Sequence, residues 1–363
     1  MAKILKGIDK VETTAGTVVD LDNISASGSA GGLSSTTLGF TRSEDANFIY
    51  YDMGQEVANT ADGHSTSASH FMIGAGNEGG GFHTSVDLLS FASAAAVTAH
   101  GSTHAGSGVQ TESNGSVALH VSGYHSNNPP TSTTSLKDFS DSTVHSTSHG
   151  SLSNGCWDGA AMSDGDQMIV AGGYASPNAL KRSEIIAFAD TSAFNAWGDL
   201  IGSGAYYFQG ASNGSIGMLA GGTSSGSTAL NYYQSLSFSS NEAATQHGSM
   251  ATARWGQTAV SNATILIVCG AGGAAGGDQD VYQEKYAFDA QSTAVAIGDM
   301  HRARRAFGGG SSGTEYILAG GVGSGDAKES TSEKNSFEDN ATASDWSSLG
   351  ANRGWVQGTS GNA

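Results

Sequence analysis

Residues 167 to 173 read Gln-Met-Ile-Val-Ala-Gly-Gly. A short apolar run that ends in two glycines is typical of a buried strand that stops where the backbone needs glycine's conformational freedom. A second strand is predicted over residues 183–188, followed by Trp-Gly-Asp-Leu at 197–200. With a returning strand, the unit has four short strands and no helical periodicity, which predicts one blade of a β-propeller.

The unit recurs every 48 to 50 residues, in three series that keep one phase. The residues that follow the apolar strand are Ala75, Gly123, Gly172, Gly221, Gly270 and Gly320. The aromatic residues of the next strand are Phe91, Phe139, Phe188, Phe238, Phe288 and Phe337. The residues of the later turn are Gly101, Gly150, Gly198, Gly248, Gly298 and Ser347. Because three independent residue types share one phase, the chain is predicted to be all-β and built from repeats.

The two ends of the chain decide the number of blades, because a propeller must close or leave strand edges exposed. Residues 353–357 repeat the first strand of a blade, and the chain stops before the matching glycines. Residues 30–53 contain Ala-Gly-Gly and an apolar run, and could supply the remainder. We therefore predict seven blades, closed by N- and C-terminal strands, with one blade shared between 24–54 and 350–363. Six blades with a separate N-terminal segment is the alternative.

This pattern resembles the kelch family, whose repeat carries a double glycine, a downstream aromatic, a Trp and a basic residue. The units that begin at Gly172 and Gly320 match it most fully. Arg254, Arg305 and Arg353 stand near the family's basic position. The resemblance implies a kelch-like propeller over residues 24–363, preceded by an arm over residues 1–23.

Charge and composition favour some partners over others. The formal net charge is −18, and residues 43–136 contain neither Lys nor Arg, so nucleic acid is not an expected partner. Residues 1–10 lack the apolar stretch of a secretory signal, and no later run predicts a membrane span. Cys156 and Cys269 fall two blades apart, and we expect no disulfide between them.

Four residues are candidates for binding, and no catalytic, cofactor-binding or metal-binding residue is predicted. Arg302, Arg304 and Arg305 form the densest basic spot and could clamp a carboxylate or pair with an acidic neighbour. Trp157 could act as a stacking platform for a sugar.

Histidine pairs with metal-like spacing also occur along the chain. His100, His149 and His247 each begin a His-Gly-Ser triplet, 49 and then 98 residues apart. Equivalent, solvated turn residues on separate blades explain this pattern more simply than a metal site does.

A second resemblance is to kelch-like repeats in virion and tail-fibre proteins of marine bacteriophages, carried by Gly-Asp-Leu at 198–200 and Asn-Ala-Thr at 340–342. It implies a structural or binding protein of a phage virion rather than an enzyme. Such a protein is assembled in the host cytoplasm and exposed outside the cell. The arm would contact other virion subunits in an oligomeric assembly, and the propeller a host glycan or protein. A free glycan-binding propeller is the alternative, and a propeller hydrolase or oxidase is a third possibility.

Overall fold

The computed structural model describes the chain as two units. Side chains and backbone are described over residues 68–362, except 79–80, 96, 126–129, 144–147, 226–227, 274–278 and 290–292, and before residue 68 the backbone of nine short strands is described. Contacts divide the chain into Met1–Ala58 and Asn59–Ala363. This division falls at residue 58, whereas the sequence placed the end of the arm at residue 23.

The first unit contains short antiparallel strands. β1 (Lys3–Ile4), β7 (Ile49–Met53) and β6 (Phe40–Glu44) form a three-stranded sheet in that order. Two hairpins join β2 (Lys10–Glu12) to β3 (Val18–Asp20) and β4 (Ser29–Ala30) to β5 (Leu33–Ser34).

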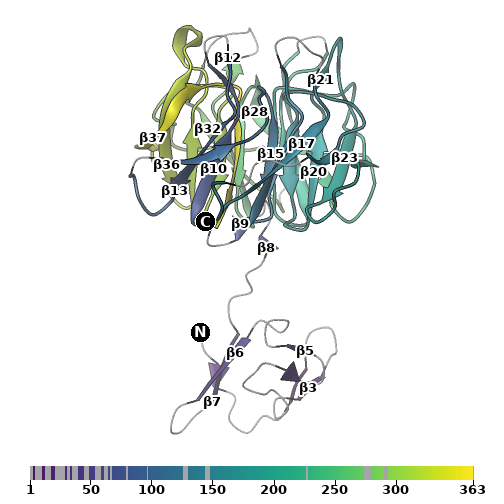
Figure 1. Cartoon of the computed structure of the whole chain (residues 1–363), viewed down its shortest axis with the longest axis vertical. Coiled ribbons are helices and arrows are strands. Elements are labelled where there is room, and N and C mark those ends of the chain that lie inside the picture. Colours follow the sequence, from purple (N-terminus) through teal and green to yellow (C-terminus); the bar gives the residue numbers. More distant parts are fainter. Residues whose placement is uncertain are drawn as a thin grey trace. The chain divides into compact units, whose positions relative to one another are not determined.

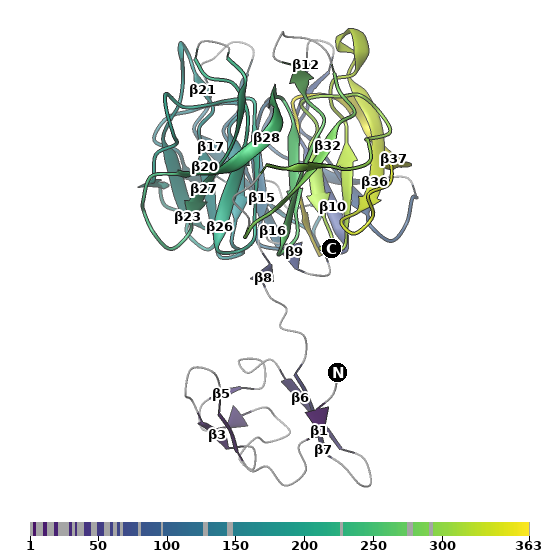
Figure 2. The same ribbon diagram turned by 180° about the vertical axis from the view of Figure 1, so that it is seen from behind.

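The second unit is a β-propeller of six antiparallel blades, numbered I to VI in the order of their second strands (Figures 1 and 2). Blade I is β38 (Gln357–Gly361), β10 (His70–Gly74), β13 (Ser85–Ser90) and β14 (Thr98–Ser102). Blade II is β15 (Gln110–Ser113), β16 (Val117–Val121), β17 (Thr133–Asp138) and β18 (Ser148–Ser151). Blade III is β19 (Ala160–Ser163), β20 (Gln167–Ala171), β23 (Ser183–Ala187) and β24 (Asn195–Trp197).

Blade IV is β25 (Gln209–Ser212), β26 (Ile216–Ala220), β27 (Leu230–Ser237) and β28 (Thr245–Trp255), which also pairs with β31 (Gly272–Gly273). Blade V is β29 (Thr258–Ser261), β30 (Ile265–Cys269), β32 (Gln283–Ala287) and β33 (Val295–Ala296). Blade VI is β34 (Gly308–Ser311), β35 (Glu315–Ala319), β36 (Glu329–Ser336) and β37 (Ser344–Arg353). The first strand of each blade lies innermost, and these strands contact one another in a closed ring.

Three short hairpins and one 3-10 turn lie outside the six blade sheets. Three hairpins pair β8 (Asn59–Thr60) with β9 (His64–Ser65), β11 (Asn77–Glu78) with β12 (Gly81–Phe82), and β21 (Tyr174–Ala175) with β22 (Asn178–Ala179). A 3-10 turn, η2, spans Ser324–Asp326. Within the propeller, β12 and β21 lie at the end opposite the C-terminus (Figure 1).

The prediction of seven blades is wrong, and so is the predicted partner of the C-terminal strand. β38 pairs with β10, in a register that places Gln357 opposite Gly74 and Gly361 opposite His70. The apolar run at residues 49–53 is β7, which pairs instead with β1 and β6 in the first unit. Residues 30–53 resemble a blade in composition, but strand pairing with the rest of the chain decides blade membership.

The turn at the double glycine has the same backbone conformation in all six blades. Two consecutive residues with positive φ follow the second strand of every blade, as in Gly172 (φ +65°) and Gly173 (φ +92°). The six pairs are 75–76, 122–123, 172–173, 221–222, 270–271 and 320–321. In blade II the turn therefore begins at Ser122, one residue before the Gly123 that the sequence pattern indicated.

Apolar side chains fill the space between neighbouring blades. The six aromatic residues in phase with Phe188 are all buried, and Phe238 of blade IV packs in one cluster with Ile169 of blade III. Cys156 and Cys269 are buried and free. Among the residues that the structure describes, no helix is long and apolar enough to cross a membrane.

Candidate functional site

Six residues form a ring around the propeller axis, just before the innermost strands. All six have a positive φ, between +51° and +71°. We call this set the axial ring, and its members are Gly108, Asp158, Tyr207, Gly256, Ala306 and Trp355. Five of the backbone N–H groups donate to the carbonyl of the preceding member at 2.7 to 2.9 Å, and the amide of Val356 completes the circuit to Ala306 at 3.4 Å.

The axial ring fixes which side chains surround the mouth of the central channel. Three members are glycine or alanine, and the other three, Asp158, Tyr207 and Trp355, line a cavity of about 380 Å³. This axial cavity is also lined by Asn77, Ser107, Tyr124 and Trp157. Its volume is within the usual range for a small-molecule site.

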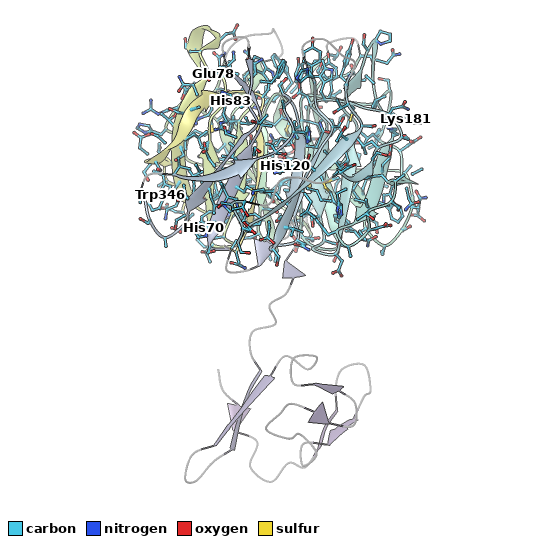
Figure 3. All side chains as sticks on the ribbon, viewed as in Figure 1. His70, Glu78, His83, His120, Lys181 and Trp346 are labelled. Carbon is cyan, nitrogen blue, oxygen red and sulfur yellow. The ribbon has the colours of Figure 1, made fainter. Side chains whose placement is uncertain are left out.

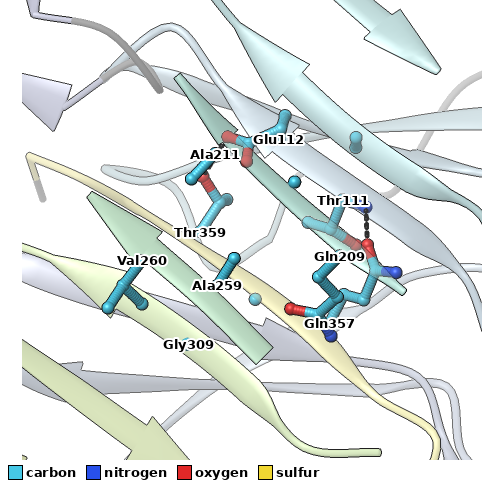
Figure 4. Close-up of a pocket in the computed structure, with 12 residues that line it drawn as sticks. Thr111, Glu112, Gln209, Ala211, Ala259, Val260, Gly309, Gln357 and Thr359 are labelled. Carbon is cyan, nitrogen blue, oxygen red and sulfur yellow. Dashed lines mark hydrogen bonds between the residues drawn. The ribbon is translucent and has the colours of Figure 1, made fainter. Parts of the chain in front are cut away.

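The channel narrows sharply below the axial cavity. Asp158, Tyr207 and Trp355 also line a space of about 20 Å³ beneath it, together with Gln209 and Gln357. Those two glutamines in turn line a third space of about 10 Å³ (Figure 4). In Figure 4, Gln357 Oε1 accepts a hydrogen bond of 3.2 Å from the backbone N–H of Thr111. Each lower space has room for about one water molecule, so only the mouth can take a larger ligand.

Aromatic rings form a connected layer around the axial cavity. Trp157 lies at its centre, with ring centroids 5.8 Å from Tyr124, 5.2 Å from Tyr174 and 5.5 Å from Tyr207. Tyr207 continues the layer to Trp255 at 5.3 Å. Such tilted and edge-to-face contacts are favourable between aromatic rings and hold them in place. Three rings of this layer, those of Trp157, Tyr124 and Tyr207, line the axial cavity and are held in fixed positions by these contacts.

Among the described residues that line the axial cavity, Asp158 is the one acidic side chain. It is 8% exposed, and its Oδ2 is buried without a hydrogen-bond partner. Burial raises the pKa of Asp158 to about 8, because the charged form loses hydration. Burial and the nearby Asp158 carboxylate also raise the pKa of the Tyr207 hydroxyl. The structure thus places a proton-binding group at the mouth of the channel.

Of the predicted binding residues, Trp157 lines the axial cavity and the three arginines do not. Arg304 is fully buried, with Nη2 3.0 Å from Glu333 Oε1, and donates to two backbone carbonyls. Arg305 pairs with Asp326 at 2.6 Å and lies over the ring of Trp255.

Arg302 pairs with Asp345 at 3.3 Å, and both side chains are exposed. The three arginines thus have three separate carboxylate partners and form no common clamp. In the repeat, Arg304 rather than Arg305 is equivalent to Arg254 and Arg353, because the spacings are then 50 and 49 residues.

The repeated histidines connect neighbouring blades. In each case Nε2 of the histidine lies within hydrogen-bond distance of a backbone carbonyl oxygen of the next blade. The distances are 2.7 Å from His100 to Asp138, 3.0 Å from His149 to Phe188 and 2.8 Å from His247 to Phe288. His100 and His149 are buried, so the expectation of solvated turn residues is wrong for them, although their equivalence is confirmed. Another histidine, His120, is fully buried on β16, and burial lowers its pKa to about 3 (Figure 3). Over the described part of the chain, no group of three or more His, Cys, Asp or Glu could hold a metal ion.

The fold and the cavity define a structural class: a six-bladed β-propeller with a cavity lined largely by aromatic residues at one end of its axis. The sequence matches no family model and no curated protein.

Proposed function

We propose that this chain is a binding protein rather than an enzyme, and that it holds a small ligand or the end of a larger one in the axial cavity. The observation that supports the proposal is a cavity of about 380 Å³ whose lining combines ordered aromatic rings with a buried carboxyl group. Apolar surfaces with a few polar groups at fixed positions are what ligand sites offer.

The proposal is tested by screening the purified full chain for ligands by thermal shift and by binding to a glycan array. We expect a ligand that stabilises the wild-type chain and loses binding in Trp157→Ala. Trp346→Phe serves as the control, because Trp346 Nε1 donates to Ser90 outside the cavity. A ligand that binds both variants and the wild type equally would place the site elsewhere.

We further propose that the chain is a kelch-like component of a phage virion, with the propeller displayed as the binding head. The division at residue 58 favours this arrangement, because it leaves a separate unit, Met1–Ala58, to contact other subunits of an oligomeric particle. The setting predicts that the protein copurifies with released phage particles. Its absence from purified particles, by mass spectrometry, would contradict the virion proposal and leave the binding site itself untouched.

A free, lectin-like propeller is the second candidate. Trp157 supports it, because a Trp ring at the mouth of a cavity is a stacking surface for a sugar, and Asn77 and Ser107 lie beside it to bind hydroxyl groups. Binding to defined glycans that is lost in Trp157→Ala would favour this candidate. An array without binding, with and without Ca²⁺, would exclude it.

A further inference from the structure

A buried carboxyl oxygen without a partner, Oδ2 of Asp158, points to a missing positive charge. Buried polar atoms are nearly always hydrogen-bonded, and a buried carboxylate is paired or loses its charge. Asp158 Oδ2 has neither a hydrogen bond nor an ion pair among the described residues. Among the described side chains that line the axial cavity, none is a lysine or an arginine.

The rings that surround Asp158 suit a cation as well. A cation within about 6 Å of an aromatic centroid is attracted by the negative face of the ring, most strongly for Trp. The axial cavity is lined by the rings of Trp157, Tyr207, Trp355 and Tyr124. One of these rings already contacts a cation, because Lys328 Nζ lies 4.4 Å from the Trp355 centroid.

The composition of the lining distinguishes between kinds of cation. A primary ammonium group has three N–H donors to satisfy, whereas a methylated ammonium group has few or none and presents apolar methyl groups. Four rings and one unpaired carboxyl oxygen match the second kind. The volume of about 380 Å³ is ample for a trimethylammonium group and a short chain.

We propose that the axial cavity binds an organic cation with a methylated ammonium group, with Asp158 as the counter-charge and Trp157, Tyr207 and Trp355 around the methyl groups. This inference rests on the proposed function of the axial cavity as a ligand site. It adds the chemical class of the ligand. The group could belong to a free small molecule or to a lipid headgroup, and the two sources share the same recognition chemistry.

The test compares choline chloride with 3,3-dimethylbutan-1-ol, a neutral compound of the same shape, by isothermal titration calorimetry on the full chain at pH 8.5. We expect choline to bind at least tenfold more tightly than the alcohol, since only choline gains from the carboxylate and the ring faces. Phosphatidylcholine vesicles provide a second arm. Choline binding without vesicle binding indicates a free ligand, whereas binding of both indicates a headgroup.

Two variants make the result specific. Asp158→Asn keeps the size of the side chain, and asparagine tolerates positive φ, so the axial ring is expected to form. It should lower choline affinity at least tenfold and leave affinity for the alcohol unchanged. Trp346→Phe, outside the cavity, should leave both affinities unchanged.

Failure of this inference is distinct from failure of the proposed function. Equal binding of choline and the alcohol, or a neutral ligand that requires Trp157, would overturn the cation assignment and leave the cavity as a binding site. If neither probe binds and no ligand from the screen depends on Trp157, both proposals fall.

Discussion

The hydroxyl of Ser212, at the end of β25, donates a hydrogen bond of 2.6 Å to the backbone carbonyl of Ser163 in the neighbouring blade. Both residues are fully buried. Each innermost strand carries a buried serine at the equivalent position; the six are Ser113, Ser163, Ser212, Ser261, Ser311 and Ser360. Ser113 donates in the same way to Ser360, which links blade II to blade I. The hydrogen bonds of Ser113 and Ser212 connect the innermost strands of adjacent blades at the end of the channel away from the axial cavity.

Replacing Ser212 by alanine should lower the free energy of unfolding by about 1–3 kcal/mol, because a buried carbonyl loses its donor. The amide of Gly214, which donates to Ser212 Oγ at 3.0 Å, loses its acceptor as well. Ser203→Ala is the control, since Ser203 is exposed, and should change stability by less than 0.5 kcal/mol by the usual behaviour of surface sites. Urea unfolding followed by tryptophan fluorescence measures both. Equal stability of the two variants would show that the serine bonds contribute nothing.

Arg353 and Asp87 form a buried ion pair at 2.7 Å between the last strand of blade VI and β13 of blade I. Asp87→Ala would leave the arginine buried without its counter-charge, and we expect a loss of about 3–5 kcal/mol. Asp345→Ala, which removes the exposed partner of Arg302, should cost no more than about 1 kcal/mol. The midpoints of urea unfolding of the two variants measure this difference in stability. A small effect of Asp87→Ala would mean that this pair does not hold blades VI and I together.

Ala75 and Ser122 occupy the first position of the double-glycine turn, each with φ +60°. A side chain at positive φ is strained by about 1–2 kcal/mol, and part of this is recovered when glycine replaces it. Ala75→Gly should therefore raise the melting temperature slightly. Ser122→Gly should lower it, because Ser122 Oγ donates to the carbonyl of Cys156 and accepts from its amide. Identical shifts for both variants would contradict this reasoning.

Asp158 should make stability fall as the pH rises. Its pKa is about 8 in the folded chain and near 3.8 in the unfolded chain, so between these values the folded state holds a proton that the unfolded state has lost. Stability attributable to this group is complete below about pH 4 and decreases by up to ~1.4 kcal/mol per pH unit until about pH 8. Among the described residues, burial and the Asp158 charge both raise the pKa of Tyr207 and of Cys156.

Asp158→Asn isolates this contribution, because it removes the titrating group and keeps the others. The difference in unfolding free energy between Asp158→Asn and the wild type should increase from pH 5 to pH 8. A difference that is constant with pH would show that Asp158 ionises normally.

The repeat and its phase could be predicted from sequence because they rest on residue types that recur. Gly172 and Phe188 have counterparts in other blades at spacings of 48 to 50, and the blades follow from them. The number of blades could not be predicted in the same way, since residues 30–53 carry a similar pattern and only strand pairing assigns them to the first unit.

The axial cavity was predictable only in part, through Trp157. The members of the axial ring share a positive φ but not a residue type. A search of the sequence for repeated residue types therefore does not pick out Asp158, Tyr207 and Trp355 as members of the same set as Gly108. The sequence could have indicated the axial ring through its fixed position, two residues before each innermost strand. Three blades place a large or charged side chain there, and three place glycine or alanine.

Binding of choline that depends on pH would require the axial cavity, the cation and the Asp158 carboxylate together. Titration calorimetry from pH 6 to pH 9 should show affinity that rises up to tenfold per pH unit until about pH 8 and then levels, as the competing proton leaves Asp158. Asp158→Asn should bind weakly at every pH. Choline affinity that does not change with pH, or that is unchanged in Asp158→Asn, would show that Asp158 is not the counter-charge of a bound cation.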